Sequence, residues 1–192
     1  MTINGFTLHD TAGAPAGSKE ILESVQAGWG FVPNLHRVLA ESPAALEAYG
    51  ALWGLAEKTA FTPVERHVAY LAIIYENECG YCMAGHTNLA RQAKVETSDV
   101  AALREGRALS DPRLEALRVF AAKLTRQRGF VSEAEVADFK KAGFDNRAVL
   151  DLLVLAATKL ISNYTNHVAR TPLDGFMKGA EWTPSAKTGE IA

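Results

Sequence analysis

Three dipeptides in this chain mark helix starts and so limit what it can fold into. Ser42-Pro43, Thr62-Pro63 and Asp111-Pro112 each join a helix-capping side chain to a proline. Proline is favoured at the first helical position because it has no N–H group, and an N–H at that position would have no partner inside the helix. Glu65 turns the second signal into a capping box, and residues 132–135 contain another. Helix starts that recur in this way predict a chain that is helical over most of its length.

Glycines complete the pattern by marking helix ends. Gly28 and Gly106 end predicted helices, and Gly143 lies where a C-terminal cap glycine belongs. No segment forms a convincing strand, so we expect an all-α, compact bundle of about eight or nine helices. A single domain is expected over residues 1–192, with irregular ends at 1–17 and 171–192. The expected helices cover 18–27, 35–41 capped by Asn34, 43–58, 63–77, 79–94, 97–106 capped by Thr97 or Ser98, 112–128, 132–143 and 145–167.

The charge balance argues against a nucleic-acid partner. The chain has 20 Lys and Arg residues against 22 Asp and Glu residues, a net charge of −2, and no dense basic cluster. Binding to nucleic acid shows in a sequence as a basic patch or stripe. We therefore expect a small-molecule substrate and no nucleic-acid partner.

No segment has the pattern of a secretory signal or a membrane span. Residues 1–19 are polar and lack the apolar run of a secretory signal. The longest apolar stretch, Val149–Ile161, contains Asp151 and Lys159 and is too short to cross a bilayer. We interpret it as a buried core helix and expect a cytoplasmic protein with no membrane partner.

The two cysteines, Cys79 and Cys82, are the main candidates for chemistry. A bridge between them would close almost no loop and would stabilise the fold little. Two cysteines also do not make a secreted disulfide scaffold. In a reducing compartment such a pair is usually kept for redox catalysis or metal binding.

On a helix, Cys79, Cys82 and His86 share one narrow face. A thiol in the first turn feels the positive end of the helix dipole, and a nearby imidazole can take its proton. Two alternatives remain. Both cysteines could be small core residues, or they could bind zinc, which needs four ligands. No second CxxC exists, so His9, His36, His67 or His167 would have to complete a zinc site, and we expect neither metal nor cofactor.

The segment from Thr62-Pro63-Val64-Glu65-Arg66 through the CxxCxxxH motif ending at His86 resembles the carboxymuconolactone decarboxylase-like superfamily, closest to its alkyl hydroperoxide reductase D, peroxidase-related branch. Segments 32–34, 42–43 and 162–167 resemble one subgroup, so the resemblance covers about residues 28–175. It implies an AhpD-like all-α fold, a homo-oligomer (trimer or hexamer, with a dimer still open) and thiol-dependent reduction of hydroperoxides. The resemblance makes Cys82 the peroxide-attacking thiol, Cys79 the resolving thiol and His86 the proton-transfer partner.

The chain departs from this family at one catalytic position. The usual glutamate, twelve residues before the first cysteine, is His67 here. The candidates to replace it are Glu76, then His67, then Glu65, although Glu65 also fits a purely capping role. His67 equally fits a buried core histidine.

The predicted substrate pocket includes Tyr81, Asn163 and Tyr164. The last two equally fit a helix end that satisfies its own carbonyl groups.

The leading hypothesis is a peroxidase that cycles between a dithiol and a disulfide and needs a thiol reductant that the sequence does not identify. One alternative is a dithiol–disulfide exchange or relay protein with little peroxidase activity. Another is a non-redox enzyme of the carboxymuconolactone decarboxylase type, or a helical interaction protein.

Overall fold

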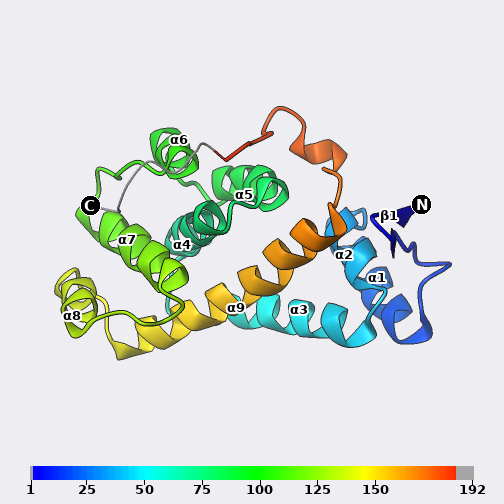
Figure 1. Ribbon diagram of the computed structural model, residues 1–192, viewed down its shortest axis with the longest axis horizontal. Helices are drawn as coiled ribbons and strands as arrows, with labels where there is room; N and C mark the ends of the chain where they lie inside the picture. Colours follow the sequence, from blue (N-terminus) through cyan, green and yellow to red (C-terminus); the bar gives the residue numbers. More distant parts are fainter. Residues whose placement is uncertain (1, 185–192) are drawn as a thin grey trace.

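Nine α-helices fill most of residues 2–184, the part of the chain that this computed structural model describes (Figure 1). Two short antiparallel strands precede them, and a 3-10 turn follows. The expected all-α class is confirmed. The elements are β1 Thr2–Ile3, β2 Phe6–Thr7, α1 Ala16–Trp29, α2 Asn34–Leu39, α3 Pro43–Ala56, α4 Pro63–Asn77, α5 Gly80–Gln92, α6 Thr97–Glu105, α7 Pro112–Arg126, α8 Glu133–Lys141, α9 Asn146–Ala169 and η1 Gly175–Met177.

The capping signals place most helix starts correctly. Thr62 and Ser132 form complete capping boxes at α4 and α8, while Ser42, Asp111 and Asp145 cap α3, α7 and α9 with their side chains. Each box satisfies backbone N–H groups that have no partner inside the helix.

Three local predictions were wrong. Pro33 is the N-cap of α2, and Asn34 instead donates a side-chain hydrogen bond to the Pro172 carbonyl at 3.2 Å. Glu96 precedes α6 as its N-cap, so Thr97 is its first residue. The segment 1–17 was expected to be irregular, yet its described part contains β1, β2 and the start of α1. Residues 185–192 of the other expected irregular end lie outside the described residues.

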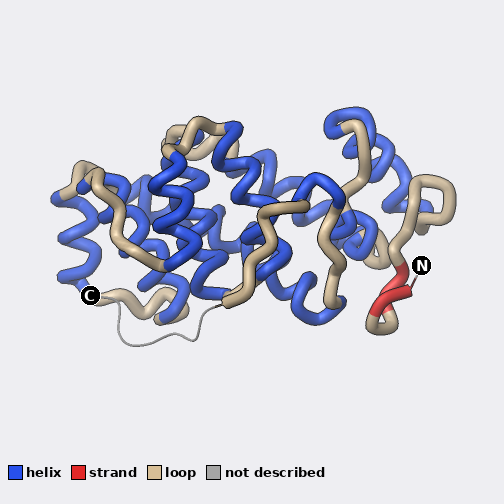
Figure 2. The backbone as a smooth tube through the Cα atoms, turned by 90° about the horizontal axis from the view of Figure 1, so that it is seen from above, coloured by secondary structure: helices blue, strands red, loops and turns tan. Residues whose placement is uncertain are grey.

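Helix α9 organises the molecule. It runs diagonally across the molecule from beside α8 to beside α2 and packs against α2, α3, α4 and α5, while α7 packs on α4 (Figure 1). Figure 2 shows the same arrangement from above as an elongated body, with the N-terminal hairpin near one end. One large apolar core joins α1 to α9, and its middle lies between α4, α5 and α9.

A segment after α9 returns across α5. The Asn88 side chain donates to the Phe176 carbonyl at 2.9 Å, and Arg104 donates to the carbonyls of Ala180 and Glu181 at 3.1 and 2.8 Å. A Cβ at Gly80 would lie 2.9 Å from the Trp182 carbonyl oxygen, so the two backbones are nearly in contact. We call residues 171–182 the C-terminal strap.

By length and composition, α9 is the one helix among the described residues that could cross a membrane. Core helices of water-soluble proteins meet the same criterion. Here the buried side of α9 carries Lys159, Asn163 and Asn166 and faces other helices.

Candidate active site

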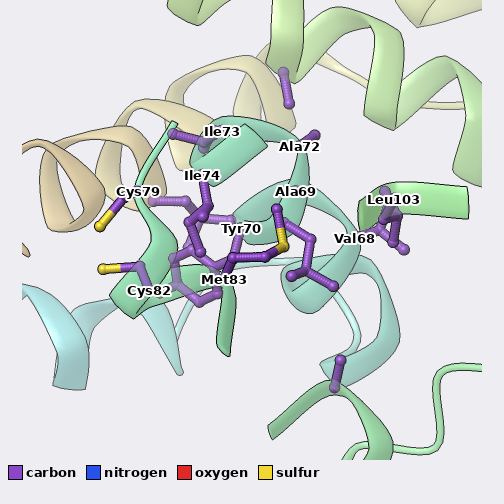
Figure 3. Packing of buried hydrophobic residues seen from close by; sticks show 14 of the residues in the cluster. Val68, Ala69, Tyr70, Ala72, Ile73, Ile74, Cys79, Cys82, Met83 and Leu103 are labelled. Atoms are coloured by element: carbon purple, nitrogen blue, oxygen red, sulfur yellow. The ribbon is translucent and has the colours of Figure 1, made fainter. Parts of the chain in front are cut away.

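The CxxC motif lies at a sharp corner between α4 and α5. Helix α4 ends with Glu78 in the left-handed conformation, at φ 57°, and Cys79 follows as the N-cap of α5. Cys82 is therefore in the first turn of α5, where the helix dipole favours an anion. Figure 3 shows that the two sulfur atoms point to the same side, away from the Met83 side chain. Both are free thiols, with Cys79 1% and Cys82 4% exposed.

Cys82 has the environment of a buried thiolate. Asn166 on α9 donates a hydrogen bond from Nδ2 to Sγ of Cys82 at 3.2 Å. Burial raises the pKa of the Cys82 thiol, but hydrogen bonding from Cys79, the charge of Lys159 and the amides of Asn166 and Asn163 outweigh burial and lower that pKa to about 6. Cys82 is therefore largely ionised at neutral pH.

Cys79 has the opposite character. Its hydrogen bond to the Cys82 sulfur, followed by burial, raises the pKa of the Cys79 thiol. The two sulfurs thus divide into a thiolate at Cys82 and a protonated thiol at Cys79. This asymmetry suits a pair in which one sulfur attacks a substrate and the other later resolves the product.

His86 lies one turn after Cys82 and is held as a neutral imidazole. Its Nε2 is 2.8 Å from Nζ of Lys159, while its ring centroid is 4.9 Å from that of Tyr70. Burial and then the charge of Lys159 hold the pKa of His86 well below its usual value. Within the described residues, Nδ1 of His86 is buried without a hydrogen-bond partner. That atom could bond to a ligand or a water molecule.

Lys159 is the site residue that sequence reasoning missed. The sequence shows it as one charge in an apolar stretch, but its side chain is 1% exposed and meets His86. A signal for it exists in the spacing, because Lys159, Asn163 and Asn166 follow one another at four and three residues and so share a helix face. Three polar residues on the buried face of an apolar helix indicate a polar site.

The two acids proposed as substitutes for the missing glutamate have partners on α7. Glu65 completes its capping box and pairs with Arg113 at 2.9 Å, while Glu76 pairs with Arg126 at 3.1 Å. Nothing in these contacts links either acid to the thiols.

His67 is the candidate substitute that the structure places near the CxxC helix. Its ring centroid is 5.7 Å from that of His86. Burial, then the charges of Lys159 and Arg66, lower the pKa of His67 to about 4. His67 is therefore a neutral neighbour of His86 at physiological pH.

The predicted pocket residues divide between the pocket and the surface. Tyr81 lines the pocket, accepts a hydrogen bond from the Leu35 N–H at 3.2 Å and donates one to Asp174. Asn163 is fully buried and accepts a hydrogen bond from Asn77 at 2.8 Å. Tyr164 does not line this pocket: it is 52% exposed and stacks on His167 at the surface. The helical period turns Tyr164 away from the face that carries Asn163 and Asn166.

A largely apolar pocket of about 40 Å³ has Cys82 in its wall. Aromatic and aliphatic side chains dominate its wall, and Lys159 and His86 are among its polar groups. A small organic molecule with an apolar body suits such a lining. The lining residues are Trp29, Pro33, Leu35, His36, Tyr49, Trp53, Tyr81, Cys82, Gly85, His86, Leu89, Lys159, Phe176 and Met177.

The described residues contain no group of three or more His, Cys, Asp or Glu side chains arranged to hold a metal ion. Neither His36 nor His67 joins the two cysteines in a ligand set within that range.

Comparisons with known proteins agree with this architecture. Residues 43–122 match the model of the Carboxymuconolactone decarboxylase family. The fold is similar to that of a peroxidase-related protein with an alkylhydroperoxidase AhpD core from Ralstonia eutropha JMP134, at 24% identity and TM-score 0.78 over 90% of this chain and 93% of that one. A peroxidase-related protein from Silicibacter sp. TM1040 is similar at 22% identity and TM-score 0.75, over 90% and 94%.

A third similar structure is the debrominase Bmp8 in complex with 2,3,4-tribromopyrrole, at 15% identity and TM-score 0.73 over 91% of this chain and 94% of that one. At these identities the similarity shows the fold alone. A comparison with curated proteins finds no match.

Proposed function

Because residues 43–122 match the model of the Carboxymuconolactone decarboxylase family, we propose that this chain is a thiol-dependent peroxidase that reduces organic hydroperoxides. The observation that carries the proposal is a thiolate–thiol pair whose thiolate, Cys82, lines an apolar pocket. Cys82 has its pKa lowered to about 6, and Cys79 has its pKa raised. Peroxide reduction needs an ionised sulfur to attack the peroxide, and a second thiol can then condense with the sulfenic acid that forms.

The reaction begins when the Cys82 thiolate attacks the terminal oxygen of the hydroperoxide. The O–O bond breaks, Cys82 becomes a sulfenic acid, and the other oxygen departs as an alkoxide that takes up a proton to become an alcohol. The Cys79 sulfur then attacks the Cys82 sulfur, and water leaves as the disulfide forms. A separate thiol reductant must return two electrons and two protons to reopen the disulfide.

Burial of the sulfurs supports a small substrate over a large one. Cys79 and Cys82 are 1% and 4% exposed, so a macromolecular disulfide cannot reach them without movement of the pocket wall. This disfavours the alternative function of disulfide exchange with protein partners. A small hydroperoxide can enter through the pocket.

The proposal is tested by counting free thiols in the reduced protein before and after one equivalent of cumene hydroperoxide. We expect both thiols to be lost within seconds, and an apolar hydroperoxide to react faster than hydrogen peroxide because the pocket is mainly apolar. Thiols that survive for minutes would overturn the peroxidase proposal. Consumption of a small disulfide in the same protein would then favour the exchange function.

We also propose that the protein assembles through the outer face of α9. Leu150, Leu153, Leu160, Tyr164 and Val168 are 45–64% exposed, and their spacing of three, four or seven residues puts them in one stripe. A continuous apolar stripe on a monomer surface is a common mark of a protein interface. We infer that its occupant is a second copy of this chain.

Leu160→Lys should reduce the molar mass measured by light scattering to that of a monomer, because a lysine in the middle of an apolar interface leaves a buried unpaired charge. The matched control is Phe130→Lys, which removes an 87% exposed aromatic residue from a loop away from the stripe. We expect this control to keep the mass of the wild type. A wild-type protein that is itself monomeric would rule out the interface.

A further inference from the structure

Lys159 is a buried lysine whose nearest side-chain contacts are with neutral rings. Its Nζ lies 2.8 Å from Nε2 of His86, 4.8 Å from the ring centroid of Tyr70 and 5.5 Å from that of Trp53. Two aromatic faces and one imidazole nitrogen can stabilise an ammonium group without neutralising it. A buried charge is costly unless it has a counter-charge, so the arrangement calls for an anion.

The anion that the surroundings provide is the Cys82 thiolate. Burial lowers the pKa of Lys159, whereas the charges of Cys82 and then Cys79 raise it. In return, the charge of Lys159 lowers the pKa of Cys82. The two groups come from different helices, α9 and α5, and both line the same pocket.

The other titratable groups around Lys159 do not compete for this role. His36 on α2, His67 on α4 and His86 on α5 all have lowered pKa values, caused first by burial and next by Lys159 itself. Burial raises the pKa values of Tyr49 on α3 and Tyr70 on α4. All five are therefore uncharged near neutral pH, which leaves Lys159 and Cys82 as the charged pair.

We propose that Lys159 is the resident cation that keeps Cys82 ionised and that gives its proton, from the pocket wall, to the departing alkoxide. The second half of this role rests on the proposed peroxidase function. Lys159 begins as an ammonium group and ends the first step as an amine, while the alkoxide becomes an alcohol. When the thiol reductant reopens the disulfide, it supplies two protons. One stays on the Cys79 thiol, and the other restores the ammonium group of Lys159.

The test separates the two halves by using two reagents on Cys82. Both are applied in a Cys79→Ser background, where Cys82 is the only thiol. Alkylation by iodoacetamide needs the thiolate but no proton donor, because iodide leaves as a stable anion. Reaction with cumene hydroperoxide needs both the thiolate and a proton for the alkoxide.

Lys159→Met should slow alkylation at pH 7 by about tenfold, which corresponds to a rise of about two units in the pKa of Cys82 from its value of about 6. The alkylation rates of variant and parent should converge at high pH. The reaction with cumene hydroperoxide should slow by about a hundredfold, since loss of a general acid adds to loss of the thiolate. Lys159→Arg should restore the alkylation profile because it keeps the charge.

Thermal unfolding separates this role from a merely structural one. Replacing a buried charge by an apolar side chain of similar length is often neutral or stabilising. We therefore expect the Tm of Lys159→Met to equal or exceed that of the parent while its reactivity falls. Lys123→Met is the matched control, because this α7 lysine pairs with Glu135 on α8 and does not line the pocket, and it should leave alkylation unchanged.

An unchanged pH profile of alkylation in Lys159→Met would overturn the proposal. If the arginine and methionine variants fail to fold, Lys159→Gln gives the same comparison, because it removes the charge but keeps a polar side chain. If alkylation of Cys82 depends on Lys159 but the wild-type protein does not react with hydroperoxide, the proposed peroxidase function is excluded. That result would leave the pairing of Lys159 with Cys82 supported.

Discussion

Replacement of Cys82 by serine is expected to lower the rate of hydroperoxide reduction by about 10³-fold or more, because the thiolate is the attacking nucleophile. A serine hydroxyl in the same place stays protonated, since neither Lys159 nor Asn166 can bring its pKa near neutrality. The remaining thiol, Cys79, is a poor substitute because its burial, which does not depend on Cys82, raises its pKa.

The matched variant is Cys79→Ser, which should keep the first step and lose the second. One equivalent of hydroperoxide should convert its Cys82 to a sulfenic acid that reacts with a sulfenic-acid trap and adds one oxygen atom in mass spectrometry. Without a resolving thiol the enzyme should then stop after a single turnover. Trapped sulfenic acid on Cys79 of the Cys82 variant would reverse the assigned roles of the two sulfurs.

The largest effect on stability is expected at Gly106. This residue ends α6 in the left-handed conformation at φ 69°, and a Cβ there would lie 2.4 Å from Cζ of Tyr75. In Gly106→Ala, the backbone conformation costs about 1–2 kcal/mol and the clash with a rigid ring about 1–3 kcal/mol more. The Tm should therefore fall by about 5–15 °C, as measured by differential scanning calorimetry.

Gly30→Ala isolates the backbone contribution. Gly30 ends α1 at φ 79°, and a Cβ there would meet nothing within 4 Å. We expect this control to lose only about 1–2 kcal/mol in the free energy of unfolding. Equal losses in the two variants would show that Tyr75 moves aside without cost.

Local signals in the sequence predicted the helices well because capping is a local interaction. The box of Thr62 and Glu65 places the start of α4 at the correct residue, and Ser132 with Glu135 does the same for α8. The same reasoning failed at Asn34, whose side chain bonds to Pro172 far along the chain. A competing tertiary contact is not visible in a window of a few residues.

The candidate site was predictable only where one helix contains it. The helical spacing of Cys79, Cys82 and His86 indicated α5, which has Cys79 as its N-cap and Cys82 in its first turn. Lys159 and Asn166 approach from α9, and their contacts depend on how two helices pack. Glu76 was ranked first as a proton acceptor, but its side chain lies at the α4–α7 contact, paired with Arg126.

The order of these contacts along the chain has a consequence for the newly made protein. Asn166 follows Cys82 by 84 residues, and the C-terminal strap that crosses α5 comes later still. Chains emerge from the ribosome N-terminus first and begin to fold in that order. During synthesis the CxxC segment therefore exists for some time without its amide and ammonium partners, and Cys82 has the reactivity of an ordinary cysteine. Its distinctive reactivity begins when the last helix docks, so an incomplete chain would not carry it.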